Sequence, residues 1–332
     1  MDIRNPKSLL AGADEALAVG RKPRQVILWY TGLITLLAVA VMAADYVIDT
    51  QLAKATGLSN LGLNSVLSTM KLVLPWVQMV AQMCLNLGYL YAMLRVGRKL
   101  YADQNDLKEG FRRFGPLLRM FLMQFVLCMA LGFILMYPLT IIYVFTPFSA
   151  GLVQWTESLP ATDPAALAAF LAEESTMNQL MEVMLPFMIL YLVVYLVAML
   201  PISYHFRMAN YLLAEDSRCG AFAALRGSFR MMRRNCLKLL KVDLRLWWYH
   251  VLVFLVGLIA YGDSILAAFG ISLPVSGEAA FYIFQLLYFA ALFAVYYFFR
   301  NRVELTYIMA YETLRPREEK QNSVVLGNIF QM

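Results

Sequence analysis

The chain contains six long runs of apolar residues, separated by short stretches rich in charged residues, Gly, Pro and Ser. The runs cover about residues 25–47, 72–94, 118–147, 183–205, 247–269 and 279–299. A run of about 20 apolar residues can cross the ~30 Å hydrocarbon layer of a bilayer as a helix. Strands of a membrane β-barrel would instead alternate in segments of ~10 residues. The pattern therefore predicts an all-α integral membrane protein with six transmembrane helices.

The composition supports this prediction and excludes other classes of protein. Hydrophobic residues make up 61% of the chain and charged residues 15%, whereas soluble domains contain about 45–50% and about 25%. The four cysteines include no Cys-x-x-Cys pair, and two of them, Cys84 and Cys128, lie within predicted spans. These features argue against a cytosolic enzyme, a disordered chain and a secreted disulfide scaffold.

The positive charges are distributed unevenly between the two sides of the predicted membrane domain. All but two of the 28 Lys and Arg residues fall within residues 1–24, 95–119, 207–245 and 300–320. Only Lys54 and Lys71 lie in the remaining connections. Because Lys and Arg are retained in cytoplasmic loops, we expect these four segments in the cytoplasm. The sequence thus predicts a multi-pass protein of the cell membrane with a cytoplasmic N-terminus and a cytoplasmic C-terminus.

The same pattern divides the chain into three parts. We expect a cytoplasmic amphipathic segment over residues 1–24, the six-helix membrane domain over 25–300 and a cytoplasmic tail over 301–332. A basic interfacial segment followed by a pair of spans occurs three times along the chain. We therefore consider three quasi-repeated helical hairpins, with amphipathic interfacial helices on the cytoplasmic side.

The longest of these basic segments predicts an amphipathic helix from Phe222 to Leu239. Its apolar residues recur at spacings of three and four, which is the period of a helix with one apolar stripe. Such a helix can lie in the membrane interface, with its cations among anionic lipid headgroups, or can bind an acidic partner protein. The alternative is an ordinary re-entry helix that only follows the positive-inside rule. The candidate contact residues are Arg226, Arg230, Arg233, Arg234, Lys238 and Lys241.

Polar residues within the second span form a second candidate site. Gln78, Gln82 and Asn86 are four residues apart, so they share one face of the helix. A polar seam of this kind must face another helix or a water-filled cavity. Hydrogen bonding between helices and a path for a solute both remain open.

The residues needed for catalysis or metal binding are not assembled in the sequence. His205 and His250 lie at the inner ends of the fourth and fifth spans, where single histidines usually act as interfacial anchors rather than metal ligands. The sequence also lacks a phosphate-binding Gly-rich loop. We therefore expect no catalytic residues, no cofactor and no metal. Membrane orientation accounts for the basic charge, so we expect no nucleic-acid partner.

Several segments resemble a bacterial multi-span membrane family catalogued as domain of unknown function 975. The resemblance implies a multi-span helical fold and supplies no activity, substrate or catalytic residue. The chain departs from the family pattern at Arg234, Leu237 and Arg245, where Gly, Trp and Ser are usual. The similar segments are Ala224–Asn235, Val242–Leu244, Tyr211–Asp216, Gly110–Gly115 and Tyr307–Tyr311.

These observations lead to two hypotheses of different classes. The first is a non-enzymatic scaffold, accessory subunit or envelope-maintenance factor that contacts anionic lipid, or an unidentified protein partner, through the basic helix. The second is a small-solute permease or exporter whose path follows the polar residues of the second span.

Overall fold

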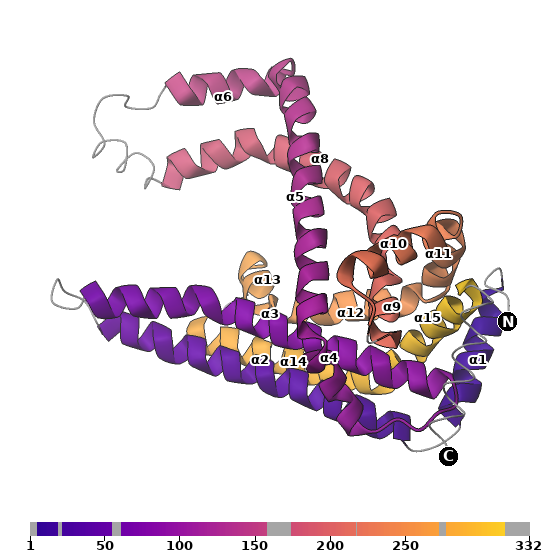
Figure 1. The fold of residues 1–332 in the computed structure, drawn as a ribbon. Coiled ribbons are helices and arrows are strands. Elements are labelled where there is room, and N and C mark those ends of the chain that lie inside the picture. Colours follow the sequence, from indigo (N-terminus) through magenta and orange to yellow (C-terminus); the bar gives the residue numbers. More distant parts are fainter. Residues whose placement is uncertain are drawn as a thin grey trace. The chain divides into compact units, whose positions relative to one another are not determined.

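The structure is a computed structural model that describes residues 5–18, 22–54, 61–157, 174–216, 218–271 and 277–315. All regular elements in these residues are helices, and no strand occurs among them (Figure 1). The chain forms two compact units, each described here by itself. The first contains Met1–Arg119 and His205–Met332, and the second contains Met120–Tyr204.

Five helices within the described residues have the length and apolar composition to cross a membrane. A sixth span results if the bent pair of helices Cys236–Arg245 and Trp247–Ile259, which meet at 65°, is counted as one. The expected all-helical architecture is thus confirmed, with five or six candidate spans. The five apolar stretches are Pro23–Leu52, Gly62–Gly97, Phe114–Val144, Met184–Glu215 and Ala279–Leu314.

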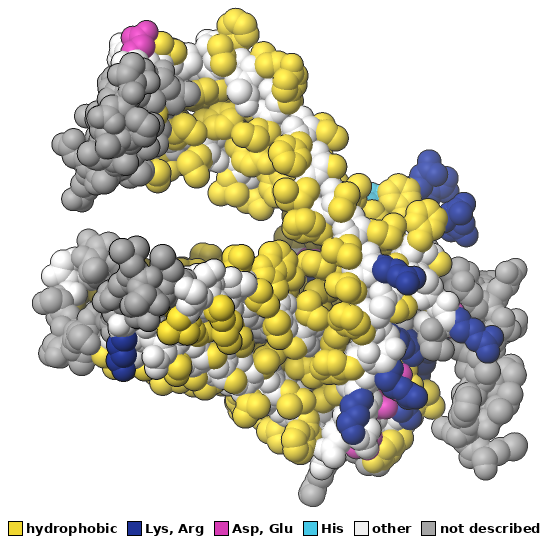
Figure 2. All heavy atoms as spheres, turned by 60° about the vertical axis from the view of Figure 1, so that its left-hand side comes forward, with side chains coloured by type: hydrophobic (Ala, Val, Ile, Leu, Met, Phe, Trp, Pro, Cys, Tyr) yellow, Lys and Arg dark blue, Asp and Glu magenta, His cyan; other side chains and the backbone are white. Residues whose placement is uncertain are grey.

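The long helices expose apolar side chains over much of their surface. In the first unit, Leu36 and Leu72 are each 69% exposed, and in the second unit Phe133 is 66% exposed. Hydrophobic side chains cover much of the visible face of the long helices in Figure 2. Soluble proteins rarely expose apolar patches of this extent, whereas lipid solvates them. The surface therefore suits a membrane protein.

Two long helices of the first unit pack against each other, α2 (Lys22–Lys54) and α3 (Leu61–Gly97). The short helix α1 (Pro6–Ala18) precedes them, and η2 (Gln104–Lys108), α4 (Glu109–Arg112) and the start of α5 (Phe114–Val144) follow. After the end of α8 (Glu174–Phe206) the chain returns to this unit. It then forms α9 (Ala209–Glu215), α10 (Ala221–Met232), α11 (Cys236–Arg245), α12 (Trp247–Ile259), α13 (Gly262–Ala268), α14 (Gly277–Val295), the π-helical turn η3 (Tyr296–Arg300) and α15 (Asn301–Leu314).

The fifth predicted span differs from the expected single helix over 247–269. The helix α12 ends at Ile259, and a turn separates it from α13. With 13 residues, α12 extends only about 20 Å, less than the ~30 Å of a hydrocarbon layer. A side chain added at Gly262 would place its Cβ 2.5 Å from the ring of Phe284 on α14. The break therefore lies where α13 approaches α14 too closely for any residue larger than glycine.

The first part of the expected cytoplasmic tail over 301–332 is a helix packed against the first unit, and its cytoplasmic position stays a prediction. Residues up to Leu314 form α15, which packs against α1 and α3. All residues from Leu305 to Tyr311 are buried. The segment is a core helix although it has charged residues near its start. Burial is possible because its polar groups have partners inside the protein. Residues 316–332 lie outside the described part of the chain.

The helix α1 is held on the first unit by apolar contacts and by two surface ion pairs. Leu9, Ala13 and Ala16 are buried, and α1 lies beside α15 (Figure 1). At its exposed side, Arg302 contacts Asp14 at 2.8 Å and Lys99 contacts Glu15 at 2.7 Å. The hydrogen bond from Lys99 lowers the pKa of the Glu15 carboxyl. Both pairs are exposed, so the buried apolar face is the main source of stability.

The second unit consists of most of α5, α6 (Pro147–Glu157) and most of α8. The rings of Tyr143 and Phe187 lie 4.9 Å apart. The Tyr191 hydroxyl donates a 3.4 Å hydrogen bond to the carbonyl of Gly132. Within the described residues, only 6% of the most apolar stretch of α5 and 0% of that of α8 is buried, which suits helices that face lipid.

Two glycines permit close contact between α3 and the segment of η2 and α4. A Cβ added at Gly110 would lie 1.7 Å from the carbonyl oxygen of Cys84, and one added at Gly88 would lie 2.1 Å from the carbonyl oxygen of Leu107. These contacts involve backbone atoms, which cannot move aside as a flexible side chain can. The two helical segments can approach this closely only with glycine at both positions.

We predict that Gly110→Ala destabilises the protein by about 3 kcal/mol or more, because overpacking against a rigid backbone forces the helices apart. Thermal unfolding of the purified protein in detergent measures this change. Gly115→Ala is the matched control, since a Cβ at Gly115 meets no atom within 4 Å. Equal midpoints for both variants would contradict the close packing of α3 and α4.

Candidate functional site

A group of tyrosines and carboxylates joins α15 to α9 and α11. We call this group the Tyr–carboxylate cluster; it contains Tyr211, Glu215, Asp243, Glu304, Tyr307 and Tyr311. Glu304, Tyr307 and Tyr311 are spaced by three and four residues, so they share one face of α15. The bonded partners of the cluster are 64 to 96 residues apart in the sequence and include residues of three of the segments that carry the family resemblance.

Three hydrogen bonds from tyrosine hydroxyls to carboxylates hold the cluster together. The hydroxyl of Tyr211 donates to Glu304, and that of Tyr307 donates to Asp243, each at 2.5 Å. The hydroxyl of Tyr311 donates to Glu215. The rings of Tyr211 and Tyr311 stack at 5.5 Å. Each carboxylate therefore accepts from a neighbouring helix, which fixes the register of α15.

Two arginines, Arg207 and Arg98, form ion pairs with carboxylates of the cluster. Arg207 contacts Asp243 at 2.7 Å, with its guanidinium 4.2 Å from the centre of the Tyr307 ring. Arg98 contacts Glu215 at 2.5 Å and Glu312 at 2.6 Å. Burial alone would lower the pKa of Arg98, but these two carboxylates outweigh it and the pKa is raised. The charges in this region are thus compensated inside the protein.

A second polar group surrounds Arg300 in the π-helical turn η3. Its guanidinium lies 4.7 Å from the ring centre of Tyr30 and 4.5 Å from that of Tyr296, and donates a 2.9 Å hydrogen bond to Asn86. Cation–π contacts of this kind stabilise an arginine that is partly withdrawn from water. A π turn adds one residue and so changes which face the following helix presents. The arrangement places Arg300 against α2 and α3.

The predicted polar seam of the second span is divided in the structure. The amide oxygen of Asn86 accepts hydrogen bonds from Arg300 at 2.9 Å and from the Tyr30 hydroxyl at 3.3 Å. Gln78 and Gln82 are half-buried and form no hydrogen bond with other described residues. Asn86 thus serves hydrogen bonding between helices, while the other two amides are available to another group.

The predicted basic helix over 222–239 is two helices, α10 and α11, separated at residues 233–235. The side chain of Asn235 donates to the carbonyl of Met231 at 2.7 Å and accepts from Lys238 at 2.6 Å. These bonds occupy backbone and side-chain groups at the junction. The local competition of an asparagine for backbone partners explains the interruption of an otherwise continuous helical period.

One face of the two helices is buried in the first unit. Leu225 is 7% exposed, and Met232 and Leu239 are fully buried. Ser228 donates to the carbonyl of His205 at 2.7 Å and accepts from the amide of Met208 at 3.1 Å. This face therefore serves packing, in contrast to the single membrane-facing stripe that the sequence predicted.

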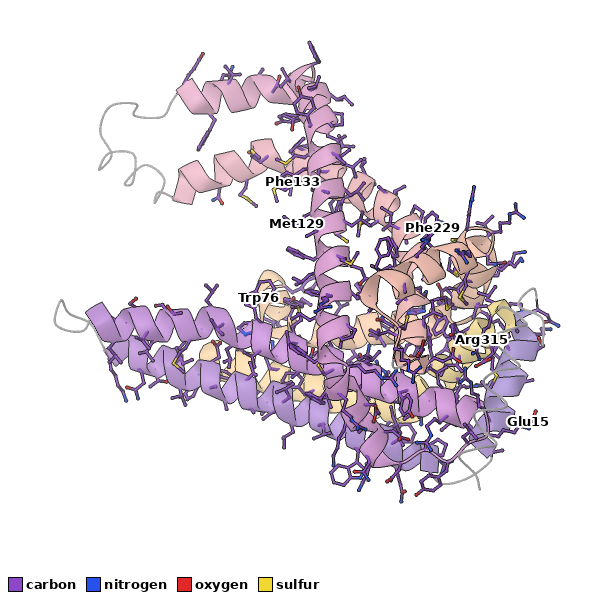
Figure 3. The ribbon with its side chains drawn as sticks, in the orientation of Figure 1. Glu15, Trp76, Met129, Phe133, Phe229 and Arg315 are labelled. Atoms are coloured by element: carbon purple, nitrogen blue, oxygen red, sulfur yellow. The ribbon has the colours of Figure 1, made fainter. Side chains whose placement is uncertain are left out.

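A second apolar strip remains exposed between the buried face and the basic face. We call it the exposed strip; Figure 3 labels its residue Phe229 on α10. On α10 it lies next to Arg226, Arg230 and Arg233, and on α11 it lies next to Lys241 and Arg245, as follows from the helical period. Both helices thus present the same order of faces. The exposed strip consists of Phe222, Phe229, Leu237, Leu240 and Leu244.

Most of the predicted basic contact residues form no hydrogen bond or ion pair with other described residues. Arg226, Arg230, Arg233, Arg234 and Lys241 are exposed and form no hydrogen bond or ion pair with other described residues. Lys238 is half-buried and bonded to Asn235, as described above. The structure therefore brings five cations to the surface that have no partner carboxylate among the described residues.

The two histidines that the sequence singled out lie in different surroundings. The imidazole of His205 lies 3.8 Å from the sulfur of Cys236, and that of His250 lies 3.4 Å from the Tyr307 hydroxyl. Among the described residues, no group of three or more His, Cys, Asp or Glu side chains could hold a metal ion. The expectation that the protein binds no metal and no cofactor stays a prediction.

The Tyr–carboxylate cluster is not predicted from the sequence, because residues 301–332 are expected there to form a tail. A signal was present: Arg300, Glu304, Tyr307 and Tyr311 recur at spacings of three and four. A polar face beside the apolar residues of the same segment predicts an amphipathic helix. The partners of that face, which come from α9 and α11, are not visible in the sequence.

Comparison with known proteins gives one match. A model of the family described as "Protein of unknown function (DUF975)" matches residues 25–318. No curated protein and no solved structure matches the chain. The matched range covers both compact units and includes α15.

We predict that Tyr211→Phe destabilises the protein by about 1–3 kcal/mol, because it removes one hydrogen bond to a carboxyl group and leaves the aromatic stacking intact. Thermal unfolding in detergent measures the loss. Tyr137→Phe is the control, since Tyr137 is 73% exposed. A Tyr211→Phe variant as stable as the control would show that the cluster does not hold α15 in place.

Proposed function

Because the chain belongs to the DUF975 family of proteins of unknown function, which supplies no activity, we propose a function from its surface. The protein is a non-enzymatic membrane scaffold, accessory subunit or envelope-maintenance factor. It contacts anionic lipid headgroups through α10 and α11. The observation that carries this proposal is the group of exposed cations on α10 and α11 beside the exposed strip. They form no ion pair with other described residues.

The order of faces on α10 and α11 supports a position in the membrane interface. An interfacial helix places its apolar side chains at the acyl boundary and its cations among the headgroups. Phe222 is 65% exposed, Leu237 75% and Leu244 63%, and water solvates such side chains poorly. A re-entry helix that only follows the positive-inside rule needs cations but no exposed strip beside them.

Charge also supports the orientation that we propose. The unpaired cations of α10 and α11 belong to the four segments that contain nearly all Lys and Arg of the chain. In Figure 2, most of the visible Lys and Arg side chains of the first unit gather at one end of its long helices. We propose that this end is cytoplasmic, with both termini on the same side of the cell membrane.

The Tyr–carboxylate cluster supports a structural rather than a catalytic role. Its acids are bonded to tyrosines and arginines of neighbouring helices, whereas a general acid or base must reach a substrate. Asp243 joins α11 to α15. Glu215 joins α9 to α15, as does the bond from Tyr211 of α9 to Glu304 of α15. In our proposal this region is a rigid support that presents the basic face.

We predict that the combined replacement of Arg226, Arg230, Arg233 and Arg234 by Gln lowers the preference for phosphatidylglycerol over phosphatidylcholine by more than about fivefold. Fivefold corresponds to about 1 kcal/mol, which is the contribution of a single cation at an anionic surface. The measurement is electron paramagnetic resonance of spin-labelled lipids around the reconstituted protein. High salt should reduce the preference of the unchanged protein in the same way.

The matched control replaces the same four residues by Lys. This variant keeps the charge but loses the planar guanidinium that binds a carboxylate or phosphate with two hydrogen bonds. Retained lipid preference in the Lys variant and loss in the Gln variant would indicate a lipid surface. If the Gln variant keeps the preference, the proposed lipid contact is wrong.

A second candidate function is a small-solute permease or exporter. One observation favours it: Gln78 and Gln82 are half-buried and form no hydrogen bond with other described residues. Such amides can line a water-filled path. Asn86 argues against continuation of this path, because Tyr30 and Arg300 already bond its amide oxygen.

Cysteine labelling in a variant without the four native cysteines distinguishes the two candidates. Under the leading proposal we expect Gln78→Cys and Gln82→Cys to react with a water-soluble maleimide no faster than Val80→Cys, which is the control between them. A path would instead give selective labelling at positions 78 and 82. That result would favour the permease.

A further inference from the structure

A pocket of about 360 Å³ opens where α11 meets α12, beside α1 and α15. Two arginines and two tryptophans form most of its lining, and the rest is aliphatic. Its volume falls in the range of about 300–1,000 Å³ that is typical of small-ligand sites. The residues around it are Leu10, Leu244, Arg245, Trp247, Trp248 and Arg302.

The two arginines give the pocket a positive charge that the protein compensates only in part. Arg245 is exposed and forms no hydrogen bond or ion pair with other described residues. Arg302 contacts Asp14 at 2.8 Å, in a pair whose side chains are 44% and 49% exposed. The planar guanidinium group binds phosphate oxygens with two parallel hydrogen bonds. The pocket thus favours an anion with several oxygens.

The apolar part of the pocket continues into the exposed strip. Leu244 belongs to both, and Trp247, which is 60% exposed, follows it at the start of α12. Tryptophan prefers the level of the lipid headgroups, where its ring is partly wet. Trp248 is held in place by edge contact with the ring of Phe299, at 5.2 Å. A ligand here has an anionic head and an apolar part.

We infer that this pocket binds the phosphate head of one anionic phospholipid between Arg245 and Arg302, with its acyl chains outside along Leu244 and the exposed strip. The site rests on the proposed interfacial position of α11 and adds to it a single, stoichiometric lipid. The volume accommodates a headgroup but not two acyl chains. From Leu244, the exposed strip continues along α11 to Leu240 and Leu237.

Native mass spectrometry of the full-length protein in detergent tests this site by titration with phosphatidylglycerol. The Arg245→Gln, Arg302→Gln variant should bind the first lipid about 30-fold more weakly, because two cations near the phosphate are lost. Arg245→Gln alone removes no contact within the described fold and should weaken binding about fivefold. It keeps the test decisive if the double variant does not fold.

The matched control, Arg119→Gln, Arg218→Gln, makes the same change of charge at two exposed arginines outside the pocket and outside α10 and α11, and should keep the first lipid. Equal loss in both double variants, or retention in both, would overturn the pocket. The lipid preference measured by spin labels tests the proposed function separately, so failure of the pocket leaves that result unaffected.

Two further ligands identify the chemistry that the pocket recognises. Phosphatidylcholine with the same acyl chains should bind more weakly than phosphatidylglycerol, and equal binding would overturn an anion site. Inorganic phosphate should not displace the bound lipid, because it lacks the apolar part. Displacement by inorganic phosphate at low concentration would assign the pocket to free phosphate and overturn the lipid assignment.

Discussion

The hydrogen bonds between α15 and its neighbours are the contacts on which the first unit depends. Three tyrosine hydroxyls donate to carboxylates on other elements, and together they connect α9, α11 and α15. Removing one partner of such a bond leaves a polar group that water cannot easily reach, so each bond resists change. These bonds fix α11 directly and α9, against which α10 packs.

This support explains how α10 and α11 can expose both cations and apolar groups. Their inner faces bury Leu225, Met232 and Leu239. Packing within the described residues therefore does not use the exposed strip or the arginines beside it. A flexible segment would fold such apolar residues inward, whereas packed helices hold them outward. The lipid contact that we propose uses this fixed order of faces, and the pocket at Arg245 lies at its end.

Close packing supplies the second constraint on the fold. In lipid, helices gain little from hydrophobic association, so van der Waals contact between backbones becomes more important. Gly88 and Gly110 bring α3 within contact distance of the η2–α4 segment. At Gly262, where α13 begins after the break in the fifth apolar run, an added Cβ would meet the side chain of Phe284 on α14.

The helical class, the long apolar spans and the uneven distribution of charge follow from the amino-acid sequence, because these depend on local composition and period. The sequence also indicated Asn86 and the arginines of α10 as polar groups of interest. Three features come from the folded protein alone: α15 is a core helix, Asn86 bonds Tyr30 and Arg300, and Arg245 and Arg302 line one pocket. Those outcomes depend on contacts between residues that are far apart in the chain. Neither hydropathy nor helical period encodes such contacts.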